Sequence, residues 1–382
     1  MNTANVIITG GSMNSPLETA YTDCLTLACV PGISLAQWHT LTEQYNASFA
    51  ALAAGKIAAS QAVTDKLCSA LAKINTTRYM QSVEWHNQSD LHHLVPFTSE
   101  AYPALLKQLP DAPLILFVTG NLTRLHDCQV AMVGSRHASH GGLDTAQRLA
   151  YELAQAGLTI TSGLATGIDG SAHKGSVSVG GRTIAVTGTG PDIVYPKRHS
   201  KLAQCIVEQG GAMVTELWPG NGPKAGHFPR RNRLIAAMTL ATVVVEAKIR
   251  SGTLITANLA ANMGRDVFAV PGSINNPMTE GCHHLIRQGA ALITCTSDIL
   301  EELSIYPCNE AAQVVHNSEK SRGESLATDK LLASVNYDVT SVDIITERSK
   351  LPVSEVLASL LQYELRGLVA AVPGGYIKLR GK

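Results

Sequence analysis

Short apolar runs alternate with longer segments of helical spacing through the middle of the chain. The runs are almost continuously apolar, as in strands that are buried on both faces. The segments between them place apolar residues three and four positions apart and often end at glycine, as helices do. Strands are predicted at 130–133, 158–161, 183–186, 212–215, 241–246, 266–270 and 291–294, with helices at 143–156, 168–178 and 199–209.

This alternation predicts the fold class of the central part. Apolar strands joined by helices are typical of a parallel sheet that is covered on both sides. We therefore expect a Rossmann-like, doubly wound, mostly parallel α/β sheet over residues 96–304.

The flanking segments have different patterns. Residues 1–15 are small and polar and are predicted to be flexible, whereas 16–95 have helical spacing and are predicted to form a helical domain of the SAM or helix-hairpin-helix kind. The Pro31-Gly32 corner within it is either a plain helical hairpin turn or a site that offers backbone N–H groups to a phosphate. Residues 305–327 are predicted to be a linker, and 328–382 a winged-helix domain of three helices and a hairpin.

Composition narrows the class of protein. The 382 residues carry 30 basic and 30 acidic side chains, which excludes a uniformly basic coat for nucleic acid. The basic residues are nevertheless concentrated, because residues 182–250 hold ten basic and four acidic side chains. No run approaches the roughly 18 apolar residues of a membrane span, and the N-terminus does not have the pattern of a secretory signal. The eight cysteines form no C-x-x-C pair, so we expect reduced thiols in the cytoplasm and no metal site.

Polar and glycine-rich motifs follow several predicted strands. Gly134-Ser135-Arg136 follows the first strand, a glycine-rich run from Ser162 to Asp169 follows the second, and Arg250-Ser251-Gly252-Thr253 precedes a helix. Such motifs bring backbone N–H groups, hydroxyls and a guanidinium to the sheet edge where ligands bind. Each motif alone is weak, since a glycine after a strand is most often only a turn.

The densest basic cluster runs from Lys224 to Ile235 and surrounds Phe228 with one Lys and three Arg. Arginine neutralises phosphates and an exposed phenylalanine stacks on a base, as in binders of single strands. The alternative is an ion network at a helix start with Phe228 in the core. Asp169 and Glu246 are single carboxylates without an evident acid or base partner, so we expect Asp169 to be a helix cap and Glu246 to be a structural partner for a nearby Arg.

The motifs occur in an order that resembles the DprA/Smf family of bacterial DNA-processing proteins. The resemblance extends over about 100–303 and rests on Gly134-Ser135-Arg136, the run 162–169, Tyr195-Pro196, the run 228–233 and the run 251–257. It implies a cytoplasmic, non-catalytic recombination mediator without a cofactor, which binds single-stranded DNA, protects incoming DNA, forms a homodimer and loads the RecA recombinase during natural transformation.

The resemblance also implies which residues bind DNA. The residues at matching positions are Gly134, Ser135, Arg136, Gly163, Lys197, Lys224, Phe228, Arg230, Arg231, Asn232, Arg233 and Ser251. Two positions depart from the family pattern: His283 replaces the usual Asn, and Thr166 stands where Arg, Lys or Leu is usual.

Two other functions compete with this interpretation. A Rossmann-like phosphoribohydrolase would need a Pro-Gly-Gly-x-Gly-Thr-x-x-Glu motif at a strand end, but Pro373-Gly374-Gly375 falls in the predicted hairpin. A tail that reads duplex DNA is disfavoured because its third helix, 352–366, offers only Arg366 as a basic residue.

Overall fold

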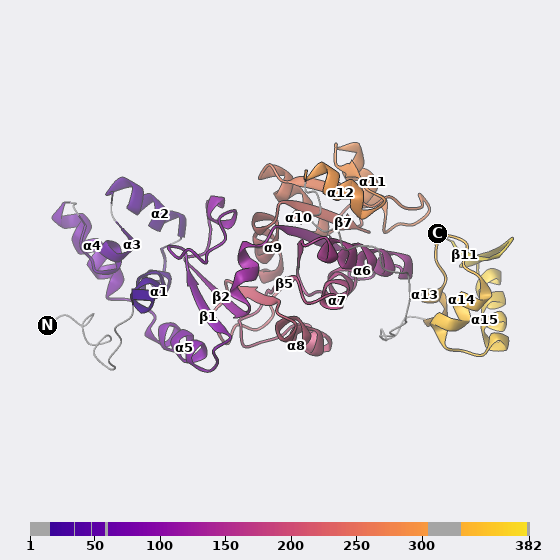
Figure 1. Ribbon diagram of the computed structural model, residues 1–382, viewed down its shortest axis with the longest axis horizontal. Coiled ribbons are helices and arrows are strands. Elements are labelled where there is room, and N and C mark those ends of the chain that lie inside the picture. Colours follow the sequence, from indigo (N-terminus) through magenta and orange to yellow (C-terminus); the bar gives the residue numbers. More distant parts are fainter. Residues whose placement is uncertain (1–15, 34, 47, 58–59, 305–329, 380–382) are drawn as a thin grey trace.

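A nine-stranded sheet forms the middle of the molecule (Figure 1). The computed structural model describes residues 16–33, 35–46, 48–57, 60–304 and 330–379. The expected flexible N-terminus and linker lie outside these residues. The strand order is β1-β2-β6-β5-β4-β3-β7-β8-β9. The strands are β1 (His92–Pro96), β2 (Ile115–Gly120), β3 (Gln129–Gly134), β4 (Thr159–Ser162), β5 (Thr183–Val186), β6 (Ala212–Thr215), β7 (Ala241–Val245), β8 (Asp266–Ala269) and β9 (Ala291–Leu292).

The sheet is doubly wound, as the apolar pattern predicts. Strands β3 to β9 pair in parallel, with Val130 opposite Ala241 and Gly134 opposite Val245 in the central pair β3–β7. Strand β2 pairs antiparallel with β6, and β1 antiparallel with β2. The sequence pattern did not identify these two outer strands, and β1 crosses the expected domain boundary at residue 95.

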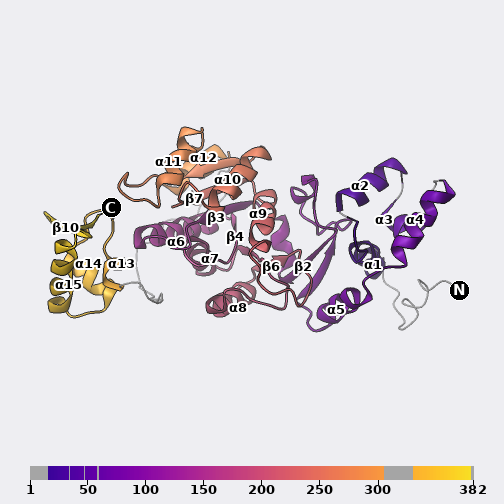
Figure 2. The ribbon, with the colours of Figure 1, turned by 180° about the vertical axis from the view of Figure 1, so that it is seen from behind.

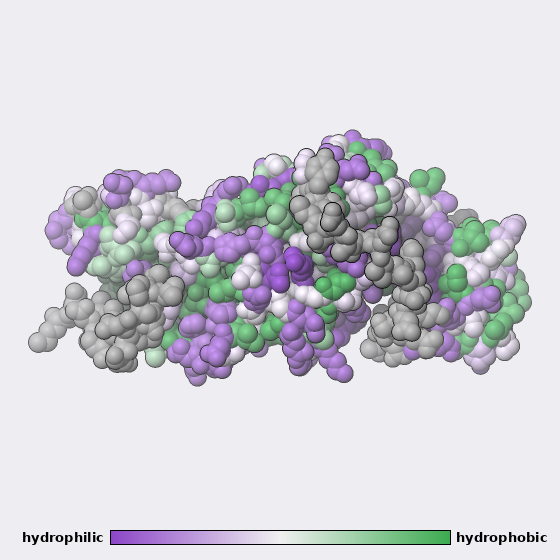
Figure 3. Space-filling view, viewed as in Figure 1, coloured by the Kyte–Doolittle hydropathy of each residue, from purple (hydrophilic) through white to green (hydrophobic). Residues whose placement is uncertain are grey.

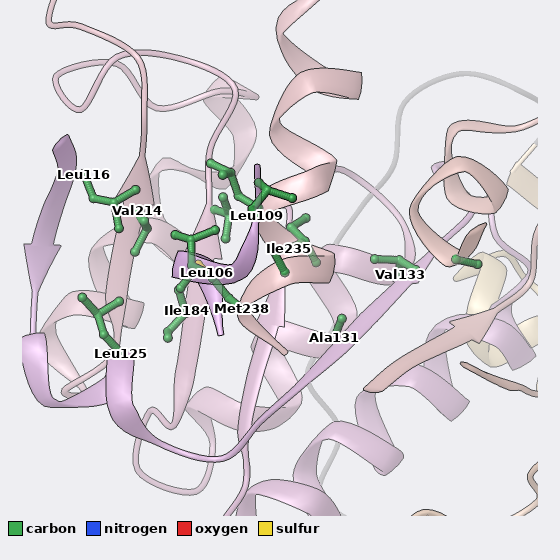
Figure 4. Close-up of a cluster of buried hydrophobic side chains, with 14 of the residues drawn as sticks. Leu106, Leu109, Leu116, Leu125, Ala131, Val133, Ile184, Val214, Ile235 and Met238 are labelled. Carbon is green, nitrogen blue, oxygen red and sulfur yellow. The ribbon is translucent and has the colours of Figure 1, made fainter. Parts of the chain in front are cut away.

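Helices cover both faces of the sheet and enclose two apolar cores. On one face, α9 (His227–Met238), α10 (Gly252–Asn262) and α11 (Glu280–Arg287) pack on the strands, and Figure 4 shows Ile235 and Met238 of α9 near Ala131 and Val133 of β3. On the other face lie α6 (His140–Gln155), α7 (Ile168–Val177), α8 (Ser200–Glu208) and α12 (Thr296–Glu302). Alternate residues of each strand therefore face different cores, which explains the continuously apolar runs.

The N-terminal part consists of five helices that share a core with the edge of the sheet. Helices α1 and α5 contact β1, and both ribbon views place them beside the outer strands (Figures 1 and 2). Leu94, Ile115 and Phe117 of the strands belong to the same cluster as Trp38 and Trp85 of the helices. The helices are α1 (Pro16–Ala28), α2 (Leu35–Gln44), α3 (Phe49–Ala53), α4 (Gln61–Leu71) and α5 (Thr76–Asn87).

The C-terminal part is a winged-helix fold with its own core at the opposite end of the molecule (Figure 1). It comprises α13 (Lys330–Ser334), α14 (Val342–Ser349), α15 (Val353–Leu365), β10 (Val369–Val372) and β11 (Gly375–Lys378), the last two paired as a hairpin. Arg348 of α14 lies 3.5 Å from Asp144 of α6, which joins this part to the sheet-bearing part.

Figure 3 shows hydrophilic residues spread over every part of the visible face, with hydrophobic patches between them. None of the described helices has the length and apolar character needed to cross a bilayer.

Candidate nucleic-acid interface

The sheet changes winding direction between β3 and β7. From β3 the chain adds β4, β5 and β6 on one side, whereas β7, β8 and β9 extend the other side. Loops that leave the carboxyl ends of β3 and β7 therefore run in opposite directions and open a crevice, where open α/β sheets bind ligands. The predicted strand-end motifs all belong to this edge.

The loop after β3 is held close to the sheet and presents Arg136 to solvent. The Ser135 N–H donates to the Glu246 carbonyl at 2.7 Å, and the Ser135 carbonyl accepts from Ile168. Gly134 has no room for a side chain, because a Cβ would collide with the Val245 carbonyl oxygen. The loop is therefore rigid, and exposed Arg136 extends from a fixed base.

Glu246 supports this loop from the end of β7. Its buried carboxylate accepts from the Ser139 N–H at 2.7 Å, the Ser139 hydroxyl at 2.6 Å and the Asn276 amide at 2.9 Å. Ser139 is the N-cap of α6, so the carboxylate also fixes the start of that helix. The structure thus gives Glu246 a structural role in place of the nearby arginine expected as its partner.

Asp169 and Arg231 lie together beneath the loop that follows β4. The Asp169 carboxylate accepts from the Gly163 and Ala165 N–H groups at 3.2 and 3.4 Å. Burial raises the pKa of Asp169, against the opposing charge of Arg231 and these two amides. Burial lowers the pKa of Arg231 to about 10, although Asp169 acts in the other direction. Asp169 and Arg231 therefore lie buried beneath the carboxyl edge of the sheet, as the floor of the candidate site, and not on its exposed surface.

Two residues predicted to bind DNA, Gly163 and Arg231, therefore have hydrogen-bond partners within this floor. The Arg231 guanidinium is buried, donates to the Val186 carbonyl and lies against Gly163, whose Cα leaves no space for a side chain. The Gly163 N–H already donates to Asp169. Gly163 and Arg231, which the resemblance assigns to DNA binding, are thus buried and have partners within the protein.

Glu216, which follows β6, holds two further arginines of the basic cluster. Arg233 is 8% exposed and donates to Glu216 at 2.5 Å, with Asp111 3.1 Å from its other side. Arg230 lies 3.1 Å from the same carboxylate, but 62% of its side chain is exposed. Arg230 thus keeps a surface for a ligand, whereas Arg233 is enclosed by acidic partners, contrary to the expectation that it lines the pocket.

An aromatic cluster lies beside Arg136. The Arg136 guanidinium carbon is 5.5 Å from the centre of the half-buried Phe228 ring. A Cβ on Gly188, at the end of β5, would lie 2.9 Å from the same ring. Tyr195 contacts Phe228 with ring centres 5.6 Å apart. Phe228 is therefore neither a core residue nor a fully exposed ring.

The start of α10 closes the other side of the edge. The Thr253 hydroxyl donates to the Gly134 carbonyl at 3.0 Å, and the Asn232 amide lies 3.5 Å from the Gly252 carbonyl. Ser251 is the N-cap, but its hydroxyl makes no capping bond and has no partner among the described residues. The free N–H groups of a helix start favour an anion at this position.

The predicted residues thus separate into two sets. The exposed cations are Arg136, Lys197, Lys224 and Arg230, whereas Gly134, Ser135, Phe228, Asn232 and Ser251 are partly exposed around them. Gly163, Arg231 and Arg233 are buried. Tyr195 and Gly188, which lie against Phe228, were not predicted from the sequence, although Tyr195-Pro196 is one of the motifs that resemble the family.

The two positions that depart from the family pattern are filled without disrupting the edge. The Thr166 hydroxyl lies 3.4 Å from the Arg136 carbonyl, and a His283 ring nitrogen lies 3.0 Å from the Gly272 carbonyl. Within the described ranges, no group of three or more His, Cys, Asp or Glu side chains could hold a metal ion, and the described cysteines are free thiols.

Together these features define a doubly wound α/β protein with a winged helix, whose strand-end edge combines cations, helix N-termini and aromatic rings. The family model for DNA recombination-mediator protein A matches residues 93–304, and the model for the DprA winged helix domain matches 318–375. The chain belongs to this family, as the motif order indicates.

Relatives with known sequences and structures cover most of the chain. Protein Smf of Escherichia coli strain K12 is 46% identical over 301 residues, which are 78% of this chain and 80% of that protein. The crystal structure of DNA processing protein A from Streptococcus pneumoniae has 33% identity and a TM-score of 0.61, and it covers 74% of this chain and 97% of that one. A structure of the Helicobacter pylori protein, described as giving insight into its single-stranded DNA binding mode, has 27% identity and a TM-score of 0.50, with coverage of 56% and 95%.

Proposed function

We propose that this protein is a non-catalytic recombination mediator that binds single-stranded DNA at the carboxyl edge of its sheet. The observation that carries the proposal is the arrangement of Arg136, Phe228 and Tyr195, with exposed Lys197 and Lys224 on the adjoining segments. Cations that follow a phosphate backbone, beside aromatic rings that accept bases, are the usual composition of a single-strand binding surface. The description of the Helicobacter pylori relative supports the same ligand.

The binding set that we propose excludes the buried arginines. Phosphates would contact Arg136, Lys197, Lys224 and Arg230, together with the N-terminus of α10 near Ser251. Gly134, Ser135 and Asn232 would shape the edge and add polar contacts. Gly163, Arg231 and Arg233 would keep the floor in place without touching DNA.

The carboxylates of the edge support a binding role over a hydrolase. A general acid or base needs a carboxylate that can reach a substrate. Asp169 accepts two backbone N–H groups beneath the loop, and Glu246 accepts three hydrogen bonds in a buried position. Both groups are occupied in holding loops, so we disfavour the phosphoribohydrolase alternative.

The remaining parts of the proposal follow from family membership. We propose that the protein acts in the cytoplasm as a homodimer formed through the Rossmann-like part, protects incoming DNA and loads RecA during natural transformation. The winged helix would contact protein or a second DNA segment. Its α15 has exposed Leu357, Leu361 and Leu365, which favours a contact poor in charge.

The test is fluorescence anisotropy with a labelled oligo-dT, titrated at several salt concentrations beside the matching duplex. We expect tight binding that prefers the single strand and weakens as salt rises. Absence of single-strand binding at low salt would refute the proposal, and nucleoside monophosphates would then be screened for hydrolysis. Binding would lead to a RecA filament assay on DNA precoated with a single-strand binding protein.

A further inference from the structure

Helix α15 of the winged helix carries a row of exposed apolar side chains. The members of this row recur at intervals of four residues, and each is at least 44% exposed: Val353, Leu357, Leu361 and Leu365. Residues at this spacing are neighbours on a helix surface, so the row forms a continuous stripe along the length of the helix, here called the α15 stripe. The inner face of the helix is separate from the stripe, because Val356, Leu360 and Tyr363 are buried in the core of the winged helix.

The α15 stripe lies where another molecule can reach it. Both ribbon views place α15 at the outer end of the winged helix, with α14 between it and the sheet-bearing part (Figures 1 and 2). Figure 3 shows hydrophobic residues at this end of the molecule. Of the fifteen large apolar side chains that are exposed in the described ranges, seven lie between residues 330 and 379, the shortest of the three parts. Such a concentration of exposed apolar surface is characteristic of contact with a partner.

The charges of α15 disfavour a nucleic acid or a lipid surface as that partner. The helix contains two charged residues, Glu355 and Glu364, and both are acidic. A phosphate backbone is bound by cations, and helices that lie on anionic membranes carry Lys and Arg on their polar face. The partner is therefore a protein that offers apolar side chains of its own.

We propose that the α15 stripe binds the α15 stripe of a second copy of this chain, with the two helices antiparallel. The stripe is complementary to itself in this arrangement, because Leu357 of each copy lies opposite Leu361 of the other, and Val353 lies opposite Leu365. A twofold axis then relates two identical surfaces, as in most homodimers. The four-residue rows of the two helices can also interdigitate, which is the commonest packing of helix pairs in globular proteins.

The charges at the two ends of the helix favour this orientation. Exposed Lys350 precedes α15, and exposed Glu364 lies beside the stripe, three positions after Leu361. The Ala371 N–H donates to the Glu364 carboxylate at 3.2 Å and helps to hold it in place. An antiparallel pair brings Lys350 of each copy toward Glu364 of the other. A parallel pair would instead bring like charges together at both ends.

The contact should be weak on its own and should add to another interface. Four apolar side chains per copy are few beside the roughly 20–30 residues that each partner contributes to a standard stable interface. If the chain also forms the homodimer proposed above, each dimer presents two α15 stripes. Stripes on different dimers then join one dimer to the next, and the assembly grows as the protein concentration rises. The inference thus goes beyond the proposed function and does not depend on DNA binding.

Sedimentation velocity of the full chain at rising protein concentration tests the pairing. The wild type should reach at least twice the mass of Leu361→Glu, because a carboxylate at this position would be buried against Leu357 of the second copy. We expect the substitution to weaken the association about 10-fold or more. Gln362→Glu is the matched control, since it adds the same charge to the next exposed residue, about a quarter of a turn away from Leu361. A thermal melt of each variant checks that the fold persists.

A reversal of charge tests the antiparallel orientation. Lys350→Glu should weaken the association, and Lys350→Glu combined with Glu364→Lys should restore it. If the double variant does not recover, the orientation is wrong. A wild type that never exceeds the mass of Leu361→Glu would overturn the pairing, as would an equal loss of association in Gln362→Glu. Failure of the homodimer proposed above would look different, because the association would then start from a monomer and remain sensitive to Leu361→Glu.

Discussion

Removal of the Glu246 carboxylate should destabilise the protein through the loop that carries Arg136. The buried carboxylate accepts the Ser139 N–H, the Ser139 hydroxyl and the Asn276 amide at 2.6 to 2.9 Å. Hydrogen bonds to a charged group contribute about 1.5–3 kcal/mol each, and buried donors left without a partner add to the loss. The hydroxyl can turn to another acceptor, so we expect Glu246→Ala to lower the free energy of unfolding by about 3–5 kcal/mol.

The backbone at Glu246 allows the contribution of the side chain to be separated from that of conformation. Its φ is 56°, in the left-handed region that glycine tolerates better than other residues. Alanine retains that strain, whereas glycine relieves about 1–2 kcal/mol of it at some cost in chain entropy. Glu246→Gly should therefore be less destabilising than Glu246→Ala, although it lacks the same three hydrogen bonds.

Urea unfolding followed by circular dichroism measures these differences. Glu208→Ala is the control, because Glu208 is exposed on α8 and its loss should change stability by no more than about 0.5 kcal/mol. If Glu246→Ala costs as little as the control, the carboxylate does not hold the loop and the reasoning fails. If glycine is the more damaging substitution, the strain at this position has been misjudged.

Three further predictions concern the rim of exposed cations (Arg136, Lys197, Lys224 and Arg230), the buried floor beneath it, and the dependence of stability on pH. Arg136→Ala should weaken binding of oligo-dT and flatten the salt dependence measured by anisotropy, and an unchanged slope would remove Arg136 from the phosphate contacts. Arg233→Ala leaves the buried Glu216 carboxylate with only Arg230 beside it. The variant should therefore have a lower thermal midpoint, while the salt dependence of DNA binding stays near the wild-type value. An unchanged midpoint with a weaker salt dependence would show that Arg233 contacts DNA. Burial lowers the pKa of His173 from its ordinary value of 6.5 to about 3. Below pH 6.5 the imidazole therefore binds a proton in the unfolded chain but stays neutral in the folded chain. The free energy of unfolding should therefore fall as pH drops from about 6.5 toward 3, by up to about 1.4 kcal/mol per pH unit, and His173 should have no effect above pH 6.5. His173→Asn should flatten this profile of stability against pH. Parallel profiles for the wild type and the variant would contradict the prediction.

The sequence predicted the parallel part of the sheet well because both sides of each strand are buried. Continuous apolar runs at 183–186 and 212–215 match β5 and β6 in full. Strand β1 was not predicted because it begins with His92 and His93, whereas the apolar run at the start of β2 follows the same pattern as the predicted strands and could have identified it. Their partners lie far away in the sequence, so local pattern alone could not pair them.

The basic cluster shows what the sequence could have revealed about the site. Arg231 lies three and four positions before Leu234 and Ile235, which are buried on α9. Residues at this spacing share a helix face, which is consistent with Arg231 on the core side. Arg230 has the same spacing to buried Arg233 and Leu234 and is nevertheless exposed, so the helical period alone does not separate the two arginines. The partners of these arginines are Glu216, after β6, and Asp169, in α7, and only the fold brings them together with α9.

The burial of two arginines does not remove the charge that a nucleic acid would meet. Of the ten basic residues in 182–250, Arg231 and Arg233 are buried, which leaves eight; of the four acidic residues, the side chains of Glu216 and Glu246 are buried, which leaves two. The surplus among the remaining residues is six, as it is for the whole segment. The buried charges thus help to build the floor, and Lys197, Lys224 and Arg230 are among the cations of this segment that stay exposed. Since each phosphate neutralised on a single strand changes the salt exponent by about 0.7, substitutions in the rim should alter the exponent, and substitutions in the floor should alter stability instead.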